Sequence, residues 1–277
     1  MARHDEGFFN AKDNLRLFWE SDVPDNPKAH VAVIHGYADH CGRYRGVIDA
    51  LVKDGFAVHA FDYRGHGQAD GRRGHCDAFS QFVDDLELFW ARVVKDAGGK
   101  KCFVLSHSHG GLMSLHWLQR QPEQVAGLVF SAPFLRLAFK PPAATVWAAK
   151  LVGAAIPWLP FKNPLKPEQL TRDPQAQRTV AQDPLYNQVV TPRWFGEAGR
   201  AQDQAQRLGP GLKKPVFFFF GAKDPIASTE ATRQFFDTVG APDKKLKEYP
   251  DRVHECMNDL GREEVWQDIS RWISAHV

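Results

Sequence analysis

Cysteine is scarce in this chain, and its few copies are scattered. Only four cysteines occur among 277 residues, Cys41, Cys76, Cys102 and Cys256, and no two of them form a C-x-x-C pair. Disulfide frameworks and structural zinc sites both need grouped cysteines. The spacing therefore favours buried free thiols over either of those structures.

The chain also lacks an excess of charge of one sign. Lys and Arg number 35 against 33 Asp and Glu, a formal net charge of +2, and no basic block stands out. Proteins that bind phosphate backbones concentrate positive charge in patches or stripes. Nucleic acid is therefore not an expected partner.

No apolar run is suited to crossing a membrane. The longest weakly charged stretch, AATVWAAKLVGAAIPWLPF from Ala143, is interrupted by Lys150 and Pro157, whereas a span needs about 20 mostly apolar residues. The first residues, MARHDEGFFNAKDN, carry charges where a signal peptide needs an apolar stretch. We therefore expect a cytoplasmic protein, at most peripheral at a membrane surface.

What the chain does contain is a regular alternation of short apolar runs and longer amphipathic segments. Residues 31–36, 56–62, 102–106, 127–133 and 215–221 are predicted to be buried strands. Strand, helix, strand repetition implies parallel pairing through right-handed crossovers, and runs without alternation suit a sheet covered on both faces. The sequence predicts an α/β fold with a mostly parallel central sheet, helices on both faces and, from GFFNA and LRLFWES, an antiparallel edge hairpin.

This alternation of apolar and amphipathic segments stops after about Leu135 and returns near residue 207. Between these points the chain is rich in proline and small apolar residues, then polar, and contains no clear strand. We therefore predict a core built from residues 1–135 and 207–277, with a helical cap inserted at 136–206.

The stretch LSHSHGG at 105–111 lies between a predicted buried strand and a predicted helix. A serine on such a sharp turn presents its hydroxyl at the carboxyl end of the sheet, where pockets of open parallel sheets form. Ser108 is therefore the candidate nucleophile, with Ser106 and Gly110 at the flanking positions that must be small. A metal site at His107 and His109 is disfavoured, because side chains two residues apart on a turn diverge.

A serine nucleophile needs a base and an orienting carboxylate. On this type of fold the chain order is serine, acid, histidine. Asp224 follows the buried run FFFFG, and His254 follows the last predicted strand. A turn or capping aspartate and a surface loop histidine are the ordinary alternatives for each residue alone, but three residues in the required order favour an acyl-transfer site.

Such a site also needs two hydrogen-bond donors for the oxyanion. The amide of His109, which follows the candidate nucleophile, is one candidate, and the amide of Tyr37 after the first parallel strand is the other. His35 and Gly36, which precede Tyr37, are candidates for contact with the substrate, although they also fit an ordinary turn at the end of a strand.

Two longer motifs resemble the monoacylglycerol lipase and lysophospholipase branch of the α/β-hydrolase family. HGYADHCGRYRG is similar to its H-G-x-x-x-H-x-G-R-Y signature, and AFDYRGHGQADGRRGH to its D-x-x-G-H-G-x-S-x-G loop. The matched positions are His35, Gly36, His40, Gly42, Arg43 and Tyr44, then Asp62, Gly65, His66, Gly67 and Gly71, with Ala69 where serine is usual.

The resemblance implies a serine hydrolase of carboxylic esters that acts on monoacylglycerols or similar single-chain lipid esters without metal or organic cofactor. It implies Ser108 as nucleophile, Asp224 as acid, His254 as base and the Tyr37 and His109 amides as oxyanion donors. Family elbows usually have glycine at the position of Ser106 and often methionine or glutamine at that of His109. We hypothesise that the His109 imidazole alters pH dependence or acyl-chain choice, which the pH profile of His109→Met tests.

An apolar helical face is predicted in the cap, where Trp147, Leu151, Ala154, Ala155 and Trp158 recur at helical spacing. This face could pack on the core, line an acyl tunnel through Trp147 and Leu151, or make transient contact with a lipid surface.

Rival functions for the whole chain are a lysophospholipase, a broad-specificity esterase and, from another class, a binder of hydrophobic ligands without turnover. An aminopeptidase would need acidic cap residues that the sequence does not reveal, and a dehalogenase would need an aspartate nucleophile.

Overall fold

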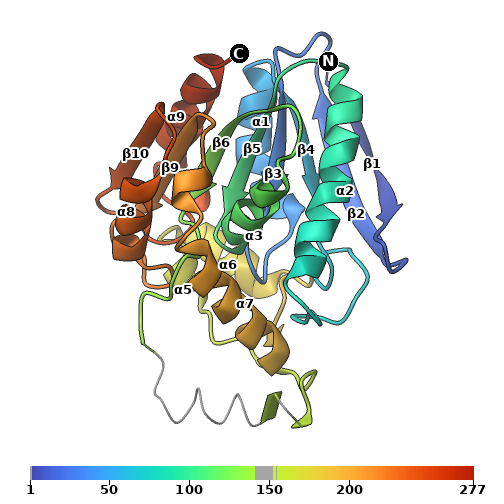
Figure 1. The fold of residues 1–277 in the computed structure, drawn as a ribbon, viewed down its shortest axis with the longest axis vertical. Helices are drawn as coiled ribbons and strands as arrows, with labels where there is room; N and C mark the ends of the chain where they lie inside the picture. Colours follow the sequence, from blue (N-terminus) through green and yellow to red (C-terminus); the bar gives the residue numbers. More distant parts are fainter. Residues whose placement is uncertain (1, 141–151, 154) are drawn as a thin grey trace.

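An eight-stranded sheet forms the centre of the molecule (Figure 1), and the structure, a computed structural model, describes residues 2–140, 152–153 and 155–277. The strands follow the order β1-β2-β4-β3-β5-β6-β9-β10. They are β1 (Arg3–Asn10), β2 (Arg16–Val23), β3 (His30–Ile34), β4 (Ala57–Phe61), β5 (Cys102–His107), β6 (Val125–Ser131), β9 (Val216–Gly221) and β10 (Lys244–Tyr249).

The sheet is parallel except at one edge. β1 pairs antiparallel with β2, and β2 antiparallel with β4, whereas every other neighbouring pair is parallel. The predicted edge hairpin and mostly parallel sheet are therefore confirmed. β1 and β10 form the two edges of the sheet.

Helices cover both faces of this sheet, as predicted. One face packs against α1 (Arg45–Lys53) and α9 (Arg262–Ser274), and the other against α2 (Ser80–Ala97), α3 (His109–Trp117) and α8 (Thr229–Thr238). The described residues also include short 3-10 helices; these are η1 (Cys41–Tyr44), η2 (Leu118–Arg120), η3 (Gly209–Gly211) and η4 (Cys256–Asn258).

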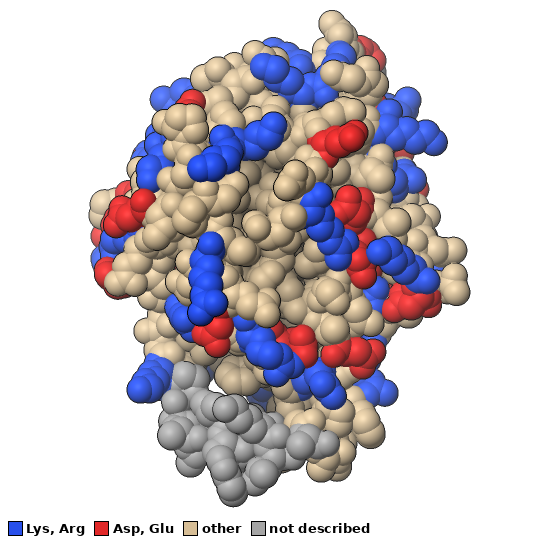
Figure 2. Space-filling view, in the orientation of Figure 1, with Lys and Arg blue, Asp and Glu red and all other residues tan. Residues whose placement is uncertain are grey.

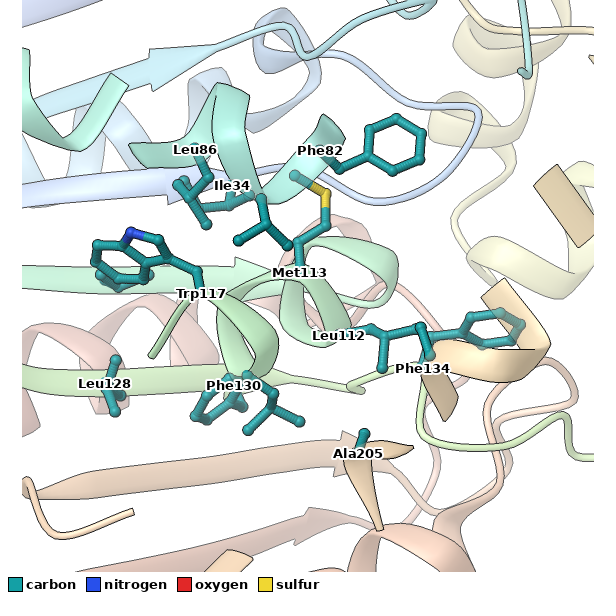
Figure 3. Packing of buried hydrophobic residues seen from close by; sticks show 14 of the residues in the cluster. Ile34, Phe82, Leu86, Leu112, Met113, Trp117, Leu128, Phe130, Phe134 and Ala205 are labelled. Carbon is teal, nitrogen blue, oxygen red and sulfur yellow. The ribbon is translucent and has the colours of Figure 1, made fainter. Parts of the chain in front are cut away.

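Alternate residues of the central strands feed the two hydrophobic layers. Val104 of β5 and Phe218 of β9 face the α2 and α3 side, and their neighbours Leu105 and Phe219 face the α1 and α9 side. Because successive strand residues point to opposite faces, an uninterrupted apolar run fills both layers. Figure 3 shows the first layer, in which Met113 of α3 packs near the side chains of the sheet and of α2.

The segment between β6 and β9 lies at one end of the sheet, in the lower part of Figure 1. Among its described helices are α5 (Pro167–Leu170), α6 (Pro174–Gln182) and α7 (Pro192–Ala205), each with a proline in its first turn. The expectation that this segment has no strand is wrong. β7 (Phe161–Lys162) and β8 (Val189–Val190) pair antiparallel, and strands of two residues are too short to show a periodic pattern.

The surface carries mixed charge. On the face shown in Figure 2, Lys and Arg side chains are interspersed with Asp and Glu side chains rather than gathered in one field. Within the described residues, none of the helices combines the length and the apolar character needed to cross a membrane.

Candidate active site

Ser108 occupies a sharp turn between β5 and α3. Its backbone has φ 50° and ψ −115°, a left-handed conformation that side chains rarely adopt. Its amide donates to the Ser131 carbonyl at 2.9 Å, and its own carbonyl accepts from Phe134 N at 3.0 Å. These bonds hold the strained residue in place, as expected where surrounding structure fixes an unusual conformation.

The flanking positions explain the composition of the turn. A Cβ on Gly110 would lie 2.5 Å from the His35 carbonyl oxygen, so only glycine fits. Ser106 is fully buried, and its hydroxyl lies 3.5 Å from the Val129 carbonyl oxygen. The hydroxymethyl that replaces the usual glycine hydrogen is therefore accommodated between β5 and β6.

Ser108, His254 and Asp224 form one chain of hydrogen bonds. The Ser108 hydroxyl lies 2.9 Å from His254 Nε2, and His254 Nδ1 lies 2.7 Å from Asp224 Oδ2. The other carboxylate oxygen, Asp224 Oδ1, accepts from the amides of Ile226 and Ala227 at 2.8 and 3.0 Å. The carboxylate is thus fixed on one side by backbone and directed toward the imidazole on the other.

This series of hydrogen bonds requires two loops to approach each other closely. A Cβ on Gly221, the last residue of β9, would lie 2.2 Å from the Val253 carbonyl oxygen and 2.3 Å from that of Arg252. Lys223 N donates to the Arg252 carbonyl at 3.0 Å. Glycine at the end of β9 therefore lets the loop carrying His254 pack directly against the turn carrying Asp224.

The electrostatic surroundings favour the protonated form of His254. Burial of the imidazole opposes its charge, but the carboxylates of Asp224, Glu255 and Asp39 outweigh this and raise the pKa of His254 above its ordinary value. A raised pKa makes the imidazole a better proton acceptor during an attack by the serine.

The loop after β3 is held rigidly beside Ser108. A Cβ on Gly36 would lie 3.4 Å from the Ser108 Cβ. The Gly36 carbonyl accepts from the Tyr63 hydroxyl at 2.7 Å and from His35 Nδ1 at 2.8 Å, while its amide donates to the Tyr44 hydroxyl at 3.2 Å. Within the described part of the chain, neither the Tyr37 nor the His109 amide donates a hydrogen bond, so both remain available as donors.

Two side chains that were expected to influence the substrate, those of His35 and His109, do not line the cavity. His35 is fully buried, its ring stacks on Tyr63 at 4.0 Å, and it lies outside the lining of the pocket. It therefore supports Gly36 and does not line the cavity. The His109 ring also points away from the pocket and is enclosed by aromatic rings, among them Phe82 at 5.1 Å and Trp194 at 5.5 Å.

His107 also lies near the centre, with its ring centroid 4.7 Å from that of His254. Burial, with His254 nearby, lowers the pKa of His107 to about 3, so this ring is neutral. Its Nδ1 lies 3.1 Å from the Ser131 hydroxyl. Across the described residues, no group of three or more His, Cys, Asp or Glu side chains is arranged to hold a metal ion.

A cavity of about 270 Å³ opens directly on Ser108 and His254. Its walls are mainly apolar and come from the segment between β6 and β9 as well as from the core, for example Leu170, Trp194 and Ala198 beside Phe134 and Ile226. A concave, largely apolar site with a few convergent polar groups is typical of a pocket for a small hydrophobic ligand.

One polar corner of this cavity escaped the sequence analysis. Asp39 and Glu255 line it, and Arg43 joins them through bonds of 2.8 Å to Asp39 Oδ1 and of 3.0 and 2.7 Å to Glu255. Asp39 lies inside the HGYADHCGRY motif and Glu255 adjoins His254. Neither stood out, because only the fold brings the two carboxylates to one guanidinium.

Only some of the residues predicted to form the apolar helical face of the cap are described by the structure. Trp147, Leu151 and Ala154 lie outside the described residues. Trp158 is half exposed, and the Arg72 guanidinium lies 5.8 Å from its ring centroid.

Known proteins are similar to this chain in sequence and fold. The hydrolase family described as serine aminopeptidase, S33 matches residues 25–261. A monoacylglycerol lipase of Mycolicibacterium smegmatis is 30% identical over 98% of both chains, and the phospholipase YtpA of Bacillus subtilis is 27% identical over 88% of this chain and 94% of its own. The crystal structure of a monoacylglycerol lipase from Paleococcus ferrophilus superposes with a TM-score of 0.81 at 28% identity and full coverage of both chains. The chain therefore belongs to the serine aminopeptidase S33 family of α/β-hydrolases, in its monoacylglycerol lipase-like branch.

Proposed function

We propose that the protein is a serine carboxylester hydrolase that cleaves monoacylglycerols or similar single-chain lipid esters. The observation that carries this proposal is the hydrogen-bonded series from Ser108 through His254 to Asp224 at the mouth of a largely apolar cavity. Relatives named as monoacylglycerol lipases support the lipid ester as substrate.

In the proposed reaction Ser108 Oγ attacks the ester carbonyl while His254 Nε2 takes the hydroxyl proton. Asp224 keeps the imidazole oriented and stabilises its charged form. The same proton is then delivered to the departing alcohol, which leaves an acyl-enzyme on Ser108. Water, activated by His254, repeats the sequence and releases the fatty acid.

The oxyanion would be held by the Tyr37 and His109 amides. The anchored peptide of Gly36 fixes the first donor, and the helical start of α3 fixes the second. Preorganised donors are effective because they need no rearrangement as charge develops. The apolar wall formed by Trp194, Ala198 and Leu170 would receive the acyl chain.

The acidic corner would receive the alcohol head group. Asp39 is 2% exposed, and within the described residues its Oδ2 has no hydrogen-bond partner. Asp39 and Glu255 together with Arg43 leave one net negative charge at this end of the cavity. This net negative charge disfavours a phosphate at this end of the cavity, which favours monoacylglycerol over lysophospholipid.

We expect the protein to release fatty acid faster from monoacylglycerol than from lysophosphatidylglycerol of the same chain length. Asp39→Asn should reduce this preference in kcat/KM by about 10-fold, because it removes the repulsion of the phosphate. Asp84→Asn, a charge loss on α2, is the matched control. An unchanged preference in Asp39→Asn would assign head-group selection to other residues, and preference of the parent for the phospholipid would favour the lysophospholipase alternative.

The segment 136–206 is proposed to act as the cap over the cavity and to touch lipid surfaces. Large apolar side chains are exposed along it, including Ile156, Trp158, Leu159 and Phe161, with Lys162 adjacent. An apolar surface flanked by cations is typical of contact with an anionic interface.

Vesicle sedimentation tests this contact. Trp158→Ala/Phe161→Ala should lower binding to vesicles containing phosphatidylglycerol by about 10-fold, because it removes two exposed aromatic groups that would insert into the lipid surface. Phe8→Ala removes an equally exposed ring from β1 (47% against 46% for Phe161) and should bind as the parent does. Equal binding by all three proteins would remove the interfacial role.

A further inference from the structure

Asp259 connects the loop that carries His254 to the middle of the cap segment, just after α5. It is fully buried and follows η4, five residues after His254. It takes no part in the reaction described above, and its side chain does not line the cavity. Its carboxylate nevertheless takes part in several hydrogen bonds.

One oxygen of Asp259 joins two separate segments. Oδ1 accepts from the amide of Arg172 and from the amide of Leu260, both at 2.8 Å. The Thr171 hydroxyl lies 3.3 Å from the same oxygen and 3.0 Å from the Asn258 carbonyl oxygen. Oδ1 therefore binds the residues that follow α5 to the end of the His254 loop.

The second oxygen extends this connection toward His254. Oδ2 accepts from Arg172 Nε at 2.9 Å and lies 3.4 Å from the amide of Val253, the residue before His254. On the other side of His254, the Glu255 amide donates to the Leu170 carbonyl at 2.8 Å. Both neighbours of His254 are thus connected to the stretch Leu170–Arg172, one directly and one through Asp259.

We propose that Asp259, paired with Arg172, is a positioning residue that couples the cap segment at Leu170–Arg172 to the His254 loop and so fixes the imidazole against Asp224 and Ser108. Leu170 lines the cavity, so the segment that contacts the acyl chain is also the one that supports the base. The inference rests on the proposed function for its catalytic consequence but not for its structural one.

Asp259→Asn keeps the shape of the side chain but loses the charge and one acceptor. We expect kcat to fall about 10-fold to 100-fold while KM changes little, because the base is misplaced and the cavity is retained. Arg172→Met should act in the same direction. The double variant should be no worse than Asp259→Asn alone, since residues that act through one contact are not additive.

The ionisation of His254, followed by NMR of its imidazole, separates positioning from a simple effect of charge and needs no substrate. If Asp259 and Arg172 hold the imidazole against Asp224, both single variants should lower the pKa of His254, because both loosen the bond that raises it. Through-space charge effects would instead lower it for Asp259→Asn and raise it for Arg172→Met. Opposite shifts, or none, would overturn the proposal.

A matched control is another partly buried contact from the cap segment, between Asp183 Oδ2 and His40 Nε2 at 2.7 Å. Asp183→Asn should leave the pKa of His254 and kcat near the parent values, since it does not touch the His254 loop. Should Asp259→Asn fail to fold by circular dichroism, the sign of the shift in Arg172→Met decides alone. Absence of esterase activity in the parent would refute the proposed function, whereas the NMR result would still decide the coupling.

Discussion

Replacing Ser108 by alanine is expected to reduce kcat for ester hydrolysis by about 10⁴-fold to 10⁶-fold. The change removes the hydroxyl that we propose forms the acyl-enzyme, while His254, the cavity and the proposed oxyanion donors remain. Fatty acid release from monoacylglycerol, measured for the parent and for Ser108→Ala side by side, gives the ratio.

Folding and binding must be shown to survive this substitution. Because the serine side chain contributes a single hydrogen bond to His254, Ser108→Ala should retain the thermal midpoint of the parent within a few degrees and bind substrate with a similar Kd. Asp224→Asn provides an independent check and should cost about 10⁴-fold, because an amide favours the wrong tautomer of the imidazole.

Turnover that persists in Ser108→Ala would refute the assignment of the nucleophile. Substrate binding by the parent without any burst or turnover would favour the binder without catalysis. Neither result depends on which head group the cavity prefers.

We expect the free energy of unfolding of this protein to fall unusually steeply as the pH falls. Burial strongly lowers the pKa of five histidines; these are His35, His59, His66, His107 and His109. For His59 and His107 the folded pKa is about 3, well below the ordinary value of 6.5. Below pH 6.5 the unfolded chain therefore takes up protons that the folded chain refuses, and stability falls as the pH falls.

The expected magnitude is large. Across the interval from about pH 7.5 to about pH 5.5, which spans the unfolded pKa, each such group lowers the free energy of unfolding by about 1.4 kcal/mol, so five together lower it by about 7 kcal/mol. His254 has the opposite sign, since its pKa is raised, but its contribution is already complete below the unfolded pKa and does not offset the loss there. Urea midpoints measured across this range test the slope, and a change below about 2 kcal/mol would contradict it.

His109→Met gives the sharpest single test of this slope. Within the described residues, both ring nitrogens of His109 lack a hydrogen-bond partner, so methionine removes a buried polar group without breaking a bond. It should raise stability at neutral pH by about 1 kcal/mol and reduce the slope by about one fifth. His4→Gln is the control, because despite some burial the pKa of this exposed histidine on β1 is raised by neighbouring carboxylates such as Asp22, and its loss should not reduce the slope. The activity profile of the same variant tests the hypothesis that His109 alters the pH dependence of hydrolysis.

The sequence allowed the core of the fold to be predicted because its strands are buried on both faces. Runs such as CFVLS and PVFFFFG can only be satisfied between two helical layers, and they form β5 and β9. The order of Ser108, Asp224 and His254 was readable for a related reason, since each residue follows a strand whose end is easy to recognise. Their mutual distances were not readable.

What escaped prediction depends on tertiary contacts. Asp39 and Glu255 are ordinary loop carboxylates until Arg43 joins them. His35 sits in the motif that suggested substrate contact, yet its ring is used to hold Gly36. Asp259 resembles any capping aspartate, because its partners Thr171 and Arg172 lie nearly ninety positions away in the chain.

The two edge strands bear on behaviour at high concentration. β1 begins with Arg3, His4, Asp5 and Glu6, and β10 contains three lysines, two of them next to each other. Charged side chains, lysine above all, are typical of edge strands that do not pair with a second sheet. Charged edge strands of this kind oppose edge-to-edge aggregation. The sheet can therefore be wide and strongly apolar inside without pairing with strands of a second molecule at its edges.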